Sequence, residues 1–285
     1  MKLQTKTILI FTMFIMSCSH NTKKNYEYQN QNIQYLIKEG TKYWNQRSNQ
    51  SALIKSNHFI SSAHEIDSNN YDLSILYSKV LNFRASFFEE NIKSRDSLYY
   101  KASRIAKNAV FEILRNNDTN LIKLNNQKEL LKLINNPSLD ISEGLYWWAM
   151  NKLLYLSSRP VIERINDRDK LEAIMYQVIS VEPDYFHGGP YRFFGLLYIK
   201  IPGINLSQSK SYFDYAINNH PHYLGNKIFY SKYYHQKSGD KNRYLIDLES
   251  VLNADEKIIP ELIPENIKFK EQAKSLIKKA GVLFE

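Results

Sequence analysis

Three histidines have side chains that could bind a metal ion or transfer a proton. His220 and His222 flank a single proline, and imidazole is a common zinc ligand. Two rings placed this way at the end of a helix point apart unless a third ligand converges on them, so we predict no metal site. His187 precedes Gly188-Gly189, where it could bind an anion or act in catalysis. No nucleophile or carboxylate is spaced to form a triad with it, so a hydrogen bond within the loop is the simpler interpretation.

The sequence also lacks the short motifs of common enzyme classes. It contains no His-Glu-x-x-His motif, no Gly-x-Ser-x-Gly motif and no phosphate-binding glycine loop. The formal net charge is +9, but the basic residues are spread along the chain and not gathered in a tract. We therefore predict a protein that is not an enzyme, uses no cofactor and does not bind nucleic acid.

Aromatic residues are the other candidates for a functional role, since the chain has 21 Tyr, 14 Phe and 3 Trp. Such side chains can line an apolar cavity, but large apolar side chains more often form the core between helices. Arg192 could bind the carboxylate of a ligand through two hydrogen bonds, or it could tie two helices together. The predicted ligand-binding residues are Trp44, Trp147, Trp148, His187, Tyr191, Arg192, Phe194 and Tyr198.

The only cysteine, Cys18, follows an N-terminal segment with the pattern of a secretory signal. Lys2 and Lys6 form a positive region, and the apolar run over residues 8–16 is too short to span a bilayer. The Ile-Met-Ser-Cys sequence that ends at Cys18 resembles the bacterial lipobox, whose cysteine thiol receives a diacylglycerol. The signal is then cut before the cysteine, and the new amine is acylated. We predict a cleaved signal peptide over residues 1–17, lipidation of Cys18 and a flexible tether over residues 18–32.

Apolar residues recur at helical spacing through the rest of the chain, and no run alternates as a strand would. The low content of Gly and Pro, 9 and 8 residues, also disfavours a fold built from many tight turns. Pro190 suits the first position of a helix, and Asn205 suits the N-cap of the next one. The main predicted helices cover residues 52–66, 71–88, 94–114, 141–158, 168–181, 222–236 and 242–252, with a last helix that starts at Pro264 and a short one within 120–138.

Several helices share the spacing of tetratricopeptide repeats. In these repeats a small residue, an aromatic or apolar one four later and a small one three later let two helices approach closely, and a proline five later ends the pair. The spacing occurs fully or in part at Ser209/Phe213/Ala216/Pro221, Leu171/Met175/Val178/Pro183, Ala102/Ala106/Ala109, Gly195/Tyr198 and Gly40/Tyr43. We predict an all-α fold, an α-solenoid of degenerate tetratricopeptide-like helix pairs that forms a single domain over residues 33–285.

The segment from Glu182 to Tyr198 resembles the T-component family of TRAP transporters, the tripartite ATP-independent periplasmic transporters. Its Gly-Gly-Pro-Tyr-Arg block, which ends at Arg192, is the most specific part. The sequences at 146–148, 201–203, 233–234 and 245–255 and the lipobox fit as well, and the similarity is strongest from about Glu143 onward. Residues 205–207 lack the glycine-rich loop that is usual after the Pro-Gly stop of this family.

The resemblance implies a periplasmic lipoprotein that acts as an accessory to transport. It implies association with a TRAP-type periplasmic substrate-binding protein, a cavity suited to apolar small molecules and the ability to form a homotrimer. Ser19 follows the lipidated cysteine where Asp would mark inner-membrane retention in enterobacterial lipoproteins, which favours the outer membrane. The alternative is a periplasmic helical-repeat scaffold or adaptor of envelope assembly. An aromatic cavity closed to peptides would favour the first function, and an open polar groove the second.

Overall fold

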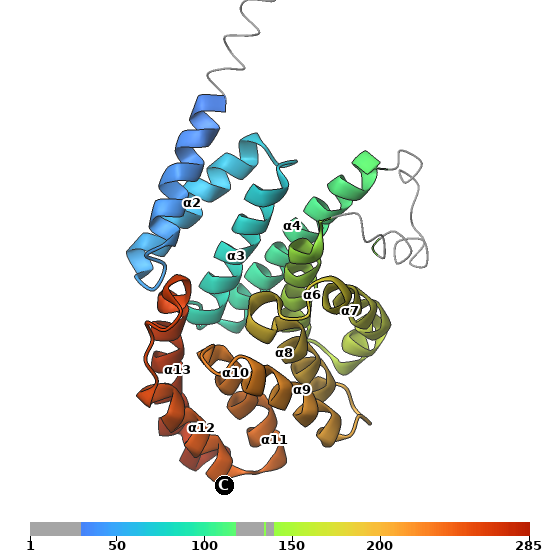
Figure 1. Cartoon of the computed structure of the whole chain (residues 1–285), viewed down its shortest axis with the longest axis vertical. Helices are drawn as coiled ribbons and strands as arrows, with labels where there is room; N and C mark the ends of the chain where they lie inside the picture. Colours follow the sequence, from blue (N-terminus) through green and yellow to red (C-terminus); the bar gives the residue numbers. More distant parts are fainter. Residues whose placement is uncertain (1–29, 118–133, 135–139) are drawn as a thin grey trace, which may run out of the picture.

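The computed structural model describes residues 30–117, 134 and 140–285 of the chain (Figure 1). Every regular element within these ranges is helical and none is a strand, which confirms the all-α prediction. No helix of this described part is long and apolar enough to cross a membrane. The predicted signal peptide, Cys18, most of the tether and most of the short helix predicted within 120–138 lie outside the described residues. Residues 30–32, which we assigned to the tether, already belong to the first described helix.

The helices follow one another with short connections, except between α4 and α6, where most of the residues lie outside the described ranges. They cover residues 30–44, then α2 (Gln50–Ile66), α3 (Tyr71–Phe87), α4 (Ile92–Asn117), α6 (Ser142–Leu156), α7 (Val161–Val181), α8 (Tyr185–Lys200), α9 (Leu206–Asn219), α10 (Leu224–Phe229), the π-helix η2 (Tyr230–His235), α11 (Gln236–Ser238), α12 (Lys241–Asn253), the 3-10 helix η3 (Pro260–Leu262) and α13 (Ile263–Leu283).

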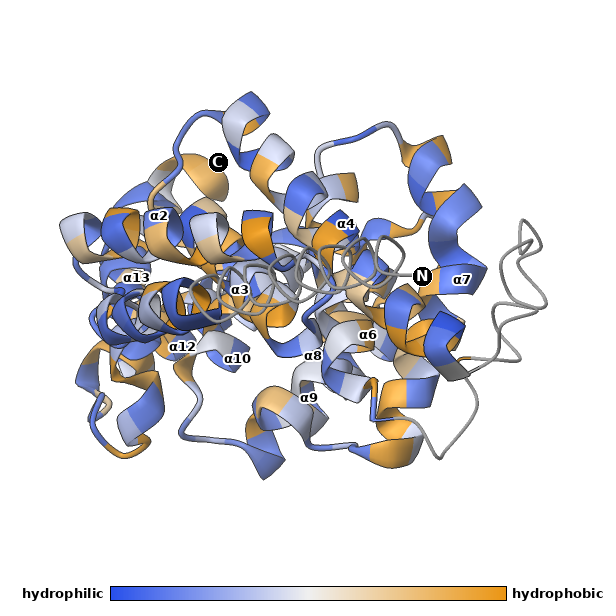
Figure 2. Ribbon diagram, turned by 90° about the horizontal axis from the view of Figure 1, so that it is seen from above, coloured by the Kyte–Doolittle hydropathy of each residue, from blue (hydrophilic) through white to orange (hydrophobic). Residues whose placement is uncertain are grey.

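Most of these helices pack on their neighbours in sequence. Helix α3 packs on α4, α4 on α6, α8 on α9, and α12 on α13. Hydrophilic and hydrophobic residues alternate along most of the ribbons in Figure 2, as expected for helices with one buried face. Most predicted boundaries are close to the observed ones, but α7 begins at Val161 and not at Arg168, and α8 begins at Tyr185 and not at Pro190. The single helix predicted over 222–236 is divided into α10, η2 and α11. The predicted N-cap of α9 is confirmed, because Asn205 Oδ1 accepts a hydrogen bond from Ser207 N at 2.9 Å.

The first helix pair crosses at a glycine. Ser56 Oγ on α2 donates a hydrogen bond of 2.9 Å to the carbonyl oxygen of Gly40 on the preceding helix. A Cβ atom on Gly40 would lie 2.4 Å from Ile60 Cδ1, so any larger residue at this position would have to displace the Ile60 side chain. Ala63, one turn further along α2, is fully buried.

Helices α8 and α9 repeat the same contacts. Ser209 Oγ donates to the carbonyl oxygen of Gly195 at 2.7 Å, and a Cβ atom on Gly195 would lie 2.7 Å from the ring of Phe213. Ala216 is fully buried, as Ala63 is in the first pair. The predicted small–apolar–small spacing therefore packs one helix on another at Ser209/Phe213/Ala216. The arrangement of successive pairs as a tetratricopeptide-like solenoid stays a prediction.

The last helix, α13, returns to the first helix pair, as Figure 1 shows at the lower end of α2. Arg47 Nε and Nη2 donate to the two carboxylate oxygens of Glu265 at 2.7 and 2.5 Å. Gln272 Nε2 on α13 donates to the carbonyl oxygen of Ser86 on α3 at 2.9 Å, and the rings of Phe87 and Phe269 meet edge to face. Helix α13 thus packs against the N-terminal part of the described chain, at Arg47 and at the end of α3.

Candidate ligand-binding cavity

A cavity of about 230 Å³ lies where these elements meet. Its walls come from the helix over residues 30–44 and from α3, α4, α6, α8, α10, η2, η3 and α13. Aromatic rings supply much of the apolar wall, among them Trp44, Phe83, Trp147, Phe186, Tyr223 and Phe269. An apolar cavity with a few polar groups is the usual form of a small-molecule site.

The polar groups of the cavity include six charged side chains. Four are cations and two are carboxylates, and they are Arg47, Lys79, Arg192, Lys232, Glu261 and Glu265. Arg47 is paired with Glu265, and Lys79 forms an ion pair with Glu143 outside the cavity. No ion pair to Arg192 or Lys232 is present among the residues that the structure describes. The cavity wall therefore carries positive charge that described carboxylates do not neutralise.

Three of the eight residues predicted to bind a ligand line this cavity: Trp44, Trp147 and Arg192. The other five do not form its wall. Trp148 is buried and meets Phe111 edge to face, and His187 stacks on the ring of Tyr223 with 5.6 Å between the ring centroids. A ligand-binding role for all eight residues stays a prediction.

Tyr191, Phe194 and Tyr198 belong to an aromatic layer between α7, α8 and α9. Phe194 is fully buried and lies 4.7 Å from Tyr176 and 5.0 Å from Tyr212, measured between ring centroids. Tyr198 contacts the same two rings, and Tyr191 stacks on Tyr215 at 3.8 Å between the ring centroids. These rings pack helix on helix, as the alternative interpretation of the aromatic residues proposed.

A short left-handed turn opens α8. Phe186, His187 and Gly188 have φ angles of 47°, 56° and 72°, and the regular helix continues from Gly189 and Pro190. Left-handed backbone costs roughly 1–2 kcal/mol for each residue with a Cβ atom, so Phe186 and His187 must be held there by other contacts. Glycine suits position 188 also because a Cβ atom would lie 2.8 Å from His220 Cδ2.

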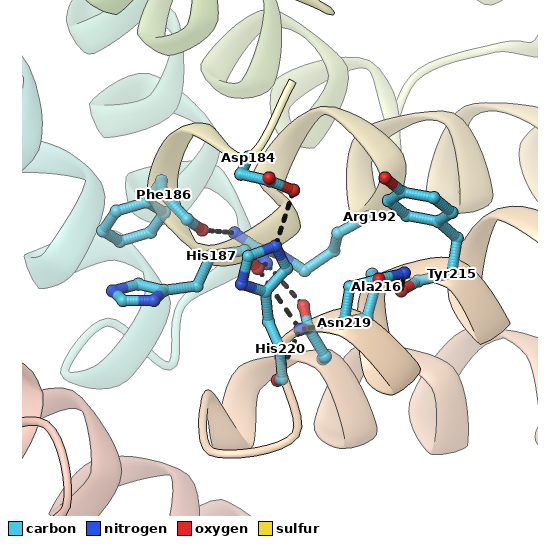
Figure 3. A network of polar contacts seen from close by, with 9 residues as sticks. Asp184, Phe186, His187, Arg192, Tyr215, Ala216, Asn219 and His220 are labelled. Carbon is cyan, nitrogen blue, oxygen red and sulfur yellow. Dashed lines mark hydrogen bonds and ion pairs between the residues drawn. The ribbon is translucent and has the colours of Figure 1, made fainter. Parts of the chain in front are cut away.

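Arg192 and Asn226 provide these contacts. Arg192 donates to the carbonyl oxygens of Phe186 and His187 at 3.3 and 3.4 Å, as Figure 3 shows for Phe186. Asn226 Nδ2 donates to the carbonyl oxygens of His187, Ala216 and His220 at 3.3, 2.9 and 3.3 Å. The two side chains thereby hold the turn, and the turn places the Phe186 ring in the cavity wall.

Arg192 is almost completely buried, with 2% of its surface exposed. It also donates to Asn226 Oδ1 at 2.6 Å and to the Tyr146 hydroxyl at 3.0 Å, and its guanidinium lies 4.5 Å from the Tyr223 ring centroid. Burial, followed by the charge of Arg192, lowers the pKa of His187. Arg192 ties α6, α8 and α10 together, and its charge faces aromatic rings and neutral oxygens.

Trp147 is fixed in the wall by a chain of hydrogen bonds. Its indole N–H donates to the Tyr185 hydroxyl at 3.0 Å, and that hydroxyl donates to Glu143 Oε1 at 3.0 Å. Glu143 in turn pairs with Lys79, which lines the cavity. Burial, followed by the charge of Glu143, raises the pKa of the Tyr185 hydroxyl, so the hydroxyl remains a proton donor at neutral pH.

The Arg47–Glu265 pair forms another part of the cavity wall. Arg47 also donates to the carbonyl oxygens of Trp44 and Glu261, and its guanidinium lies 4.5 Å from the Trp44 ring centroid. Burial raises the pKa of Glu265 even though the bond to Arg47 opposes this shift. Sequence patterns do not predict this pair, because its residues are 218 positions apart.

One of the two histidines beside Pro221 forms a contact within the protein. His220 Nε2 lies 2.9 Å from Asp184 Oδ1, and Figure 3 shows this contact beside the left-handed turn. Within the described ranges no group of three His, Cys, Asp or Glu side chains is placed to hold a metal ion. Of the two histidines considered as metal ligands, His220 therefore forms a contact with the loop residue Asp184.

Comparison with known proteins gives one result at the level of families. A search of curated proteins found no match. The family model TAtT, TRAP transporter T-component, matches residues 84–284, from the end of α3 to the end of α13. This span contains the left-handed turn, Arg192 and most of the cavity wall. The chain belongs to the TRAP transporter T-component family.

Proposed function

We propose that this protein is the lipid-anchored periplasmic accessory component of a TRAP-type transport system. Membership of the T-component family implies an accessory role in TRAP transport. In the proposed role the protein binds a TRAP-type periplasmic substrate-binding protein and accepts an apolar small ligand. The single observation that carries the ligand part is the central cavity with its aromatic wall.

The architecture favours this function over a scaffold for protein segments. A scaffold of the helical-repeat type would present an open concave surface along its helices. Here α13 reaches the first helix pair through the Arg47–Glu265 contact, and rings such as Trp44 and Phe269 face the same cavity. A space of about 230 Å³ suits part of a small molecule better than a folded segment of another protein.

Native mass spectrometry of the delipidated protein with the cognate TRAP substrate-binding protein tests the proposed partner. We expect a complex of the two proteins, and we expect the accessory protein to carry a co-purified apolar molecule. A periplasmic binding protein from an unrelated ATP-driven transporter serves as the control for nonspecific association. Absence of the complex, with both proteins folded, would contradict the proposed partner. The same spectra report whether the accessory protein forms the proposed homotrimer.

Membrane attachment has a separate test. Cys18 is the proposed lipidation site, so Cys18→Ala should move the protein from the membrane fraction to the soluble periplasmic fraction. Retention of Cys18→Ala in the membrane fraction would contradict lipid anchoring. Density separation of inner and outer membranes then tests the proposed outer-membrane location of the native protein.

A further inference from the structure

Four cations lie near one another without a carboxylate among them, and one of the four, Lys232, lines the cavity. They are Lys200 at the end of α8, Arg164 on α7, Lys232 on η2 and Lys237 on α11. In the part of the chain that the structure describes, none of them forms an ion pair. Burial and then the charges of the other three lower the pKa of Lys200, and Tyr233 alone acts in the opposite direction. Positive charge is therefore concentrated here without local compensation.

Two of these cations have an evident structural role. Arg164 Nε donates to the carbonyl oxygen of Lys200 at 3.1 Å, and Lys237 Nζ donates to that of Ile199 at 2.8 Å. Both bonds satisfy carbonyl groups at the C-terminus of α8, where the helix dipole also favours a cation. These contacts explain Arg164 and Lys237 but leave the other two cations unexplained.

Lys200 and Lys232 both point at one aromatic ring. Their Nζ atoms lie 5.1 and 5.2 Å from the ring centroid of Tyr233, and no hydrogen bond from either ammonium is present among the described residues. Tyr233 and Lys232 line the cavity. Lys232 thus brings an ammonium group to the cavity wall, Lys200 brings a second one to the ring of Tyr233, and the buried Arg192 adds positive charge to the wall.

The carboxylates of the cavity do not neutralise this end of it. Glu265 is occupied by its two hydrogen bonds with Arg47, and Glu261 is exposed to solvent. A cation that is partly removed from water attracts an anion more strongly than a fully solvated one does. The charge at this end of the cavity suits an anion, and aromatic rings supply much of the remaining wall.

We propose that the cavity binds an amphipathic anion, with its apolar chain among the aromatic rings and its carboxylate or phosphate head between Lys200 and Lys232. The proposal rests on the ligand-binding part of the proposed function and names the class of ligand. A head group at this position receives hydrogen bonds from two ammonium groups, while Arg164 and Lys237 add to the positive potential.

Four probes with the same eight-carbon chain test the head group: octanoate, octyl phosphate, 1-octanol and octylammonium. Isothermal titration calorimetry of the full protein gives the affinity, and the fluorescence of Trp44 and Trp147 in the cavity wall gives an independent signal. We expect at least one of the two anions to bind about tenfold or more tightly than 1-octanol, and octylammonium to bind most weakly. The ratio between octanoate and octyl phosphate identifies the preferred head group.

A pair of double variants tests the site. Lys200→Met with Lys232→Met removes both ammonium groups and keeps the length of the side chains. Lys274→Met with Lys278→Met removes the same charge from exposed positions on α13 and is the matched control. We expect the first variant to lose about tenfold or more of its affinity for the preferred anion and to keep its affinity for 1-octanol, while the control keeps both. Thermal unfolding checks that both variants are folded.

Three results would overturn the proposal: equal affinity of the wild-type protein for 1-octanol and the anions, unchanged anion affinity in the lysine variant, or binding of none of the four probes. Tight binding of 1-octanol alone would still support an apolar ligand. Complex formation with the substrate-binding protein is measured independently, so its outcome does not decide the fate of the anion site.

Discussion

The helix pair of residues 30–44 with α2 and the pair of α8 with α9 use the same contacts at their crossings. In each, a serine hydroxyl donates to a glycine carbonyl, at 2.9 Å for Ser56 and 2.7 Å for Ser209. Each second helix ends with a hydrogen bond to the carbonyl oxygen of its buried alanine, Ala63 or Ala216. The two pairs differ in the polar contacts that their neighbouring turns make.

In the turn after α2, the side chain of Asn70 forms hydrogen bonds only with residues close to it in sequence. Asn70 caps α3 through a hydrogen bond from Leu73 N, and its amide nitrogen reaches Asp67. At the other pair, Asn226 bonds across the turn after α9 to the left-handed turn before α8 and to Arg192. The shared contacts hold a helix pair together, and the long-range polar contacts of the second pair shape the cavity wall.

The largest difference in the free energy of unfolding is expected between substitutions of Asn226 and Asn70. Asn226→Leu removes one hydrogen bond from each of three carbonyl oxygens and the shortest hydrogen bond of the buried Arg192, so we expect a loss of about 3 kcal/mol in the free energy of unfolding. Asn70→Leu removes one helix cap and should cost about 1 kcal/mol. Urea denaturation of both variants gives the two values. Equal losses would show that the Asn226 contacts contribute no more than a cap.

Gly195→Ala and Gly40→Ala compare the two crossings. The new methyl group at 195 meets the Phe213 ring, which is fully buried, and overpacking of this kind costs about 1–3 kcal/mol. At position 40 it meets the Ile60 side chain, which is equally buried but, unlike a rigid ring, can change its rotamer. The better helix propensity of alanine offsets part of the strain at both positions. We expect the Gly195 variant to unfold at a lower urea concentration than the Gly40 variant. The reverse order would contradict the assigned role of the ring.

Ser56→Ala and Ser209→Ala test what the two pairs share. Each removes one buried hydrogen bond to a glycine carbonyl, so each should cost about 1 kcal/mol. Chemical denaturation under identical conditions should give two values of similar size. A cost at one position only would mean that the two crossings are not equivalent.

The smallest expected effect is the change of stability with pH that His64 and His187 cause. Burial, followed by Lys101 for His64 and by Arg192 for His187, lowers both pKa values below the ordinary 6.5. The unfolded chain then binds protons more readily than the folded one, so the stabilisation is complete above about pH 6.5 and is lost as the pH falls below it. Thermal unfolding between pH 7.5 and 5 should show a decreasing midpoint. His64→Gln and His187→Gln should each make this decrease smaller, and an unchanged profile in both would refute the assignment.

Local sequence patterns predict the features of this fold that depend on neighbouring residues. The spacing at Ser209/Phe213/Ala216 and the cap at Asn205 are of this kind, and the structure confirms both contacts. The start of α7 was missed because Val161, Ile162 and Ile165 are exposed, so its first turns have no buried stripe to reveal a helix.

The sequence predicts only some of the residues that line the cavity. Trp44, Trp147 and Arg192 were proposed as ligand-binding residues, but nothing in the sequence places them beside Lys232 or Glu265. The π-helical turn that carries Lys232 and Tyr233 has no distinct sequence pattern either. Contacts between distant segments depend on the packing of whole helices, which periodicity does not report.

The bond between Arg47 and Glu265 has a consequence for the order of folding. Helix pairs close short loops and can form early, whereas this contact joins residues 218 positions apart and carries the largest loop-closure cost. We expect the early intermediates to be strings of helix pairs without a cavity. The cavity then forms only when α13 docks, because Glu265, Phe269 and Gln272 of this helix belong to its wall.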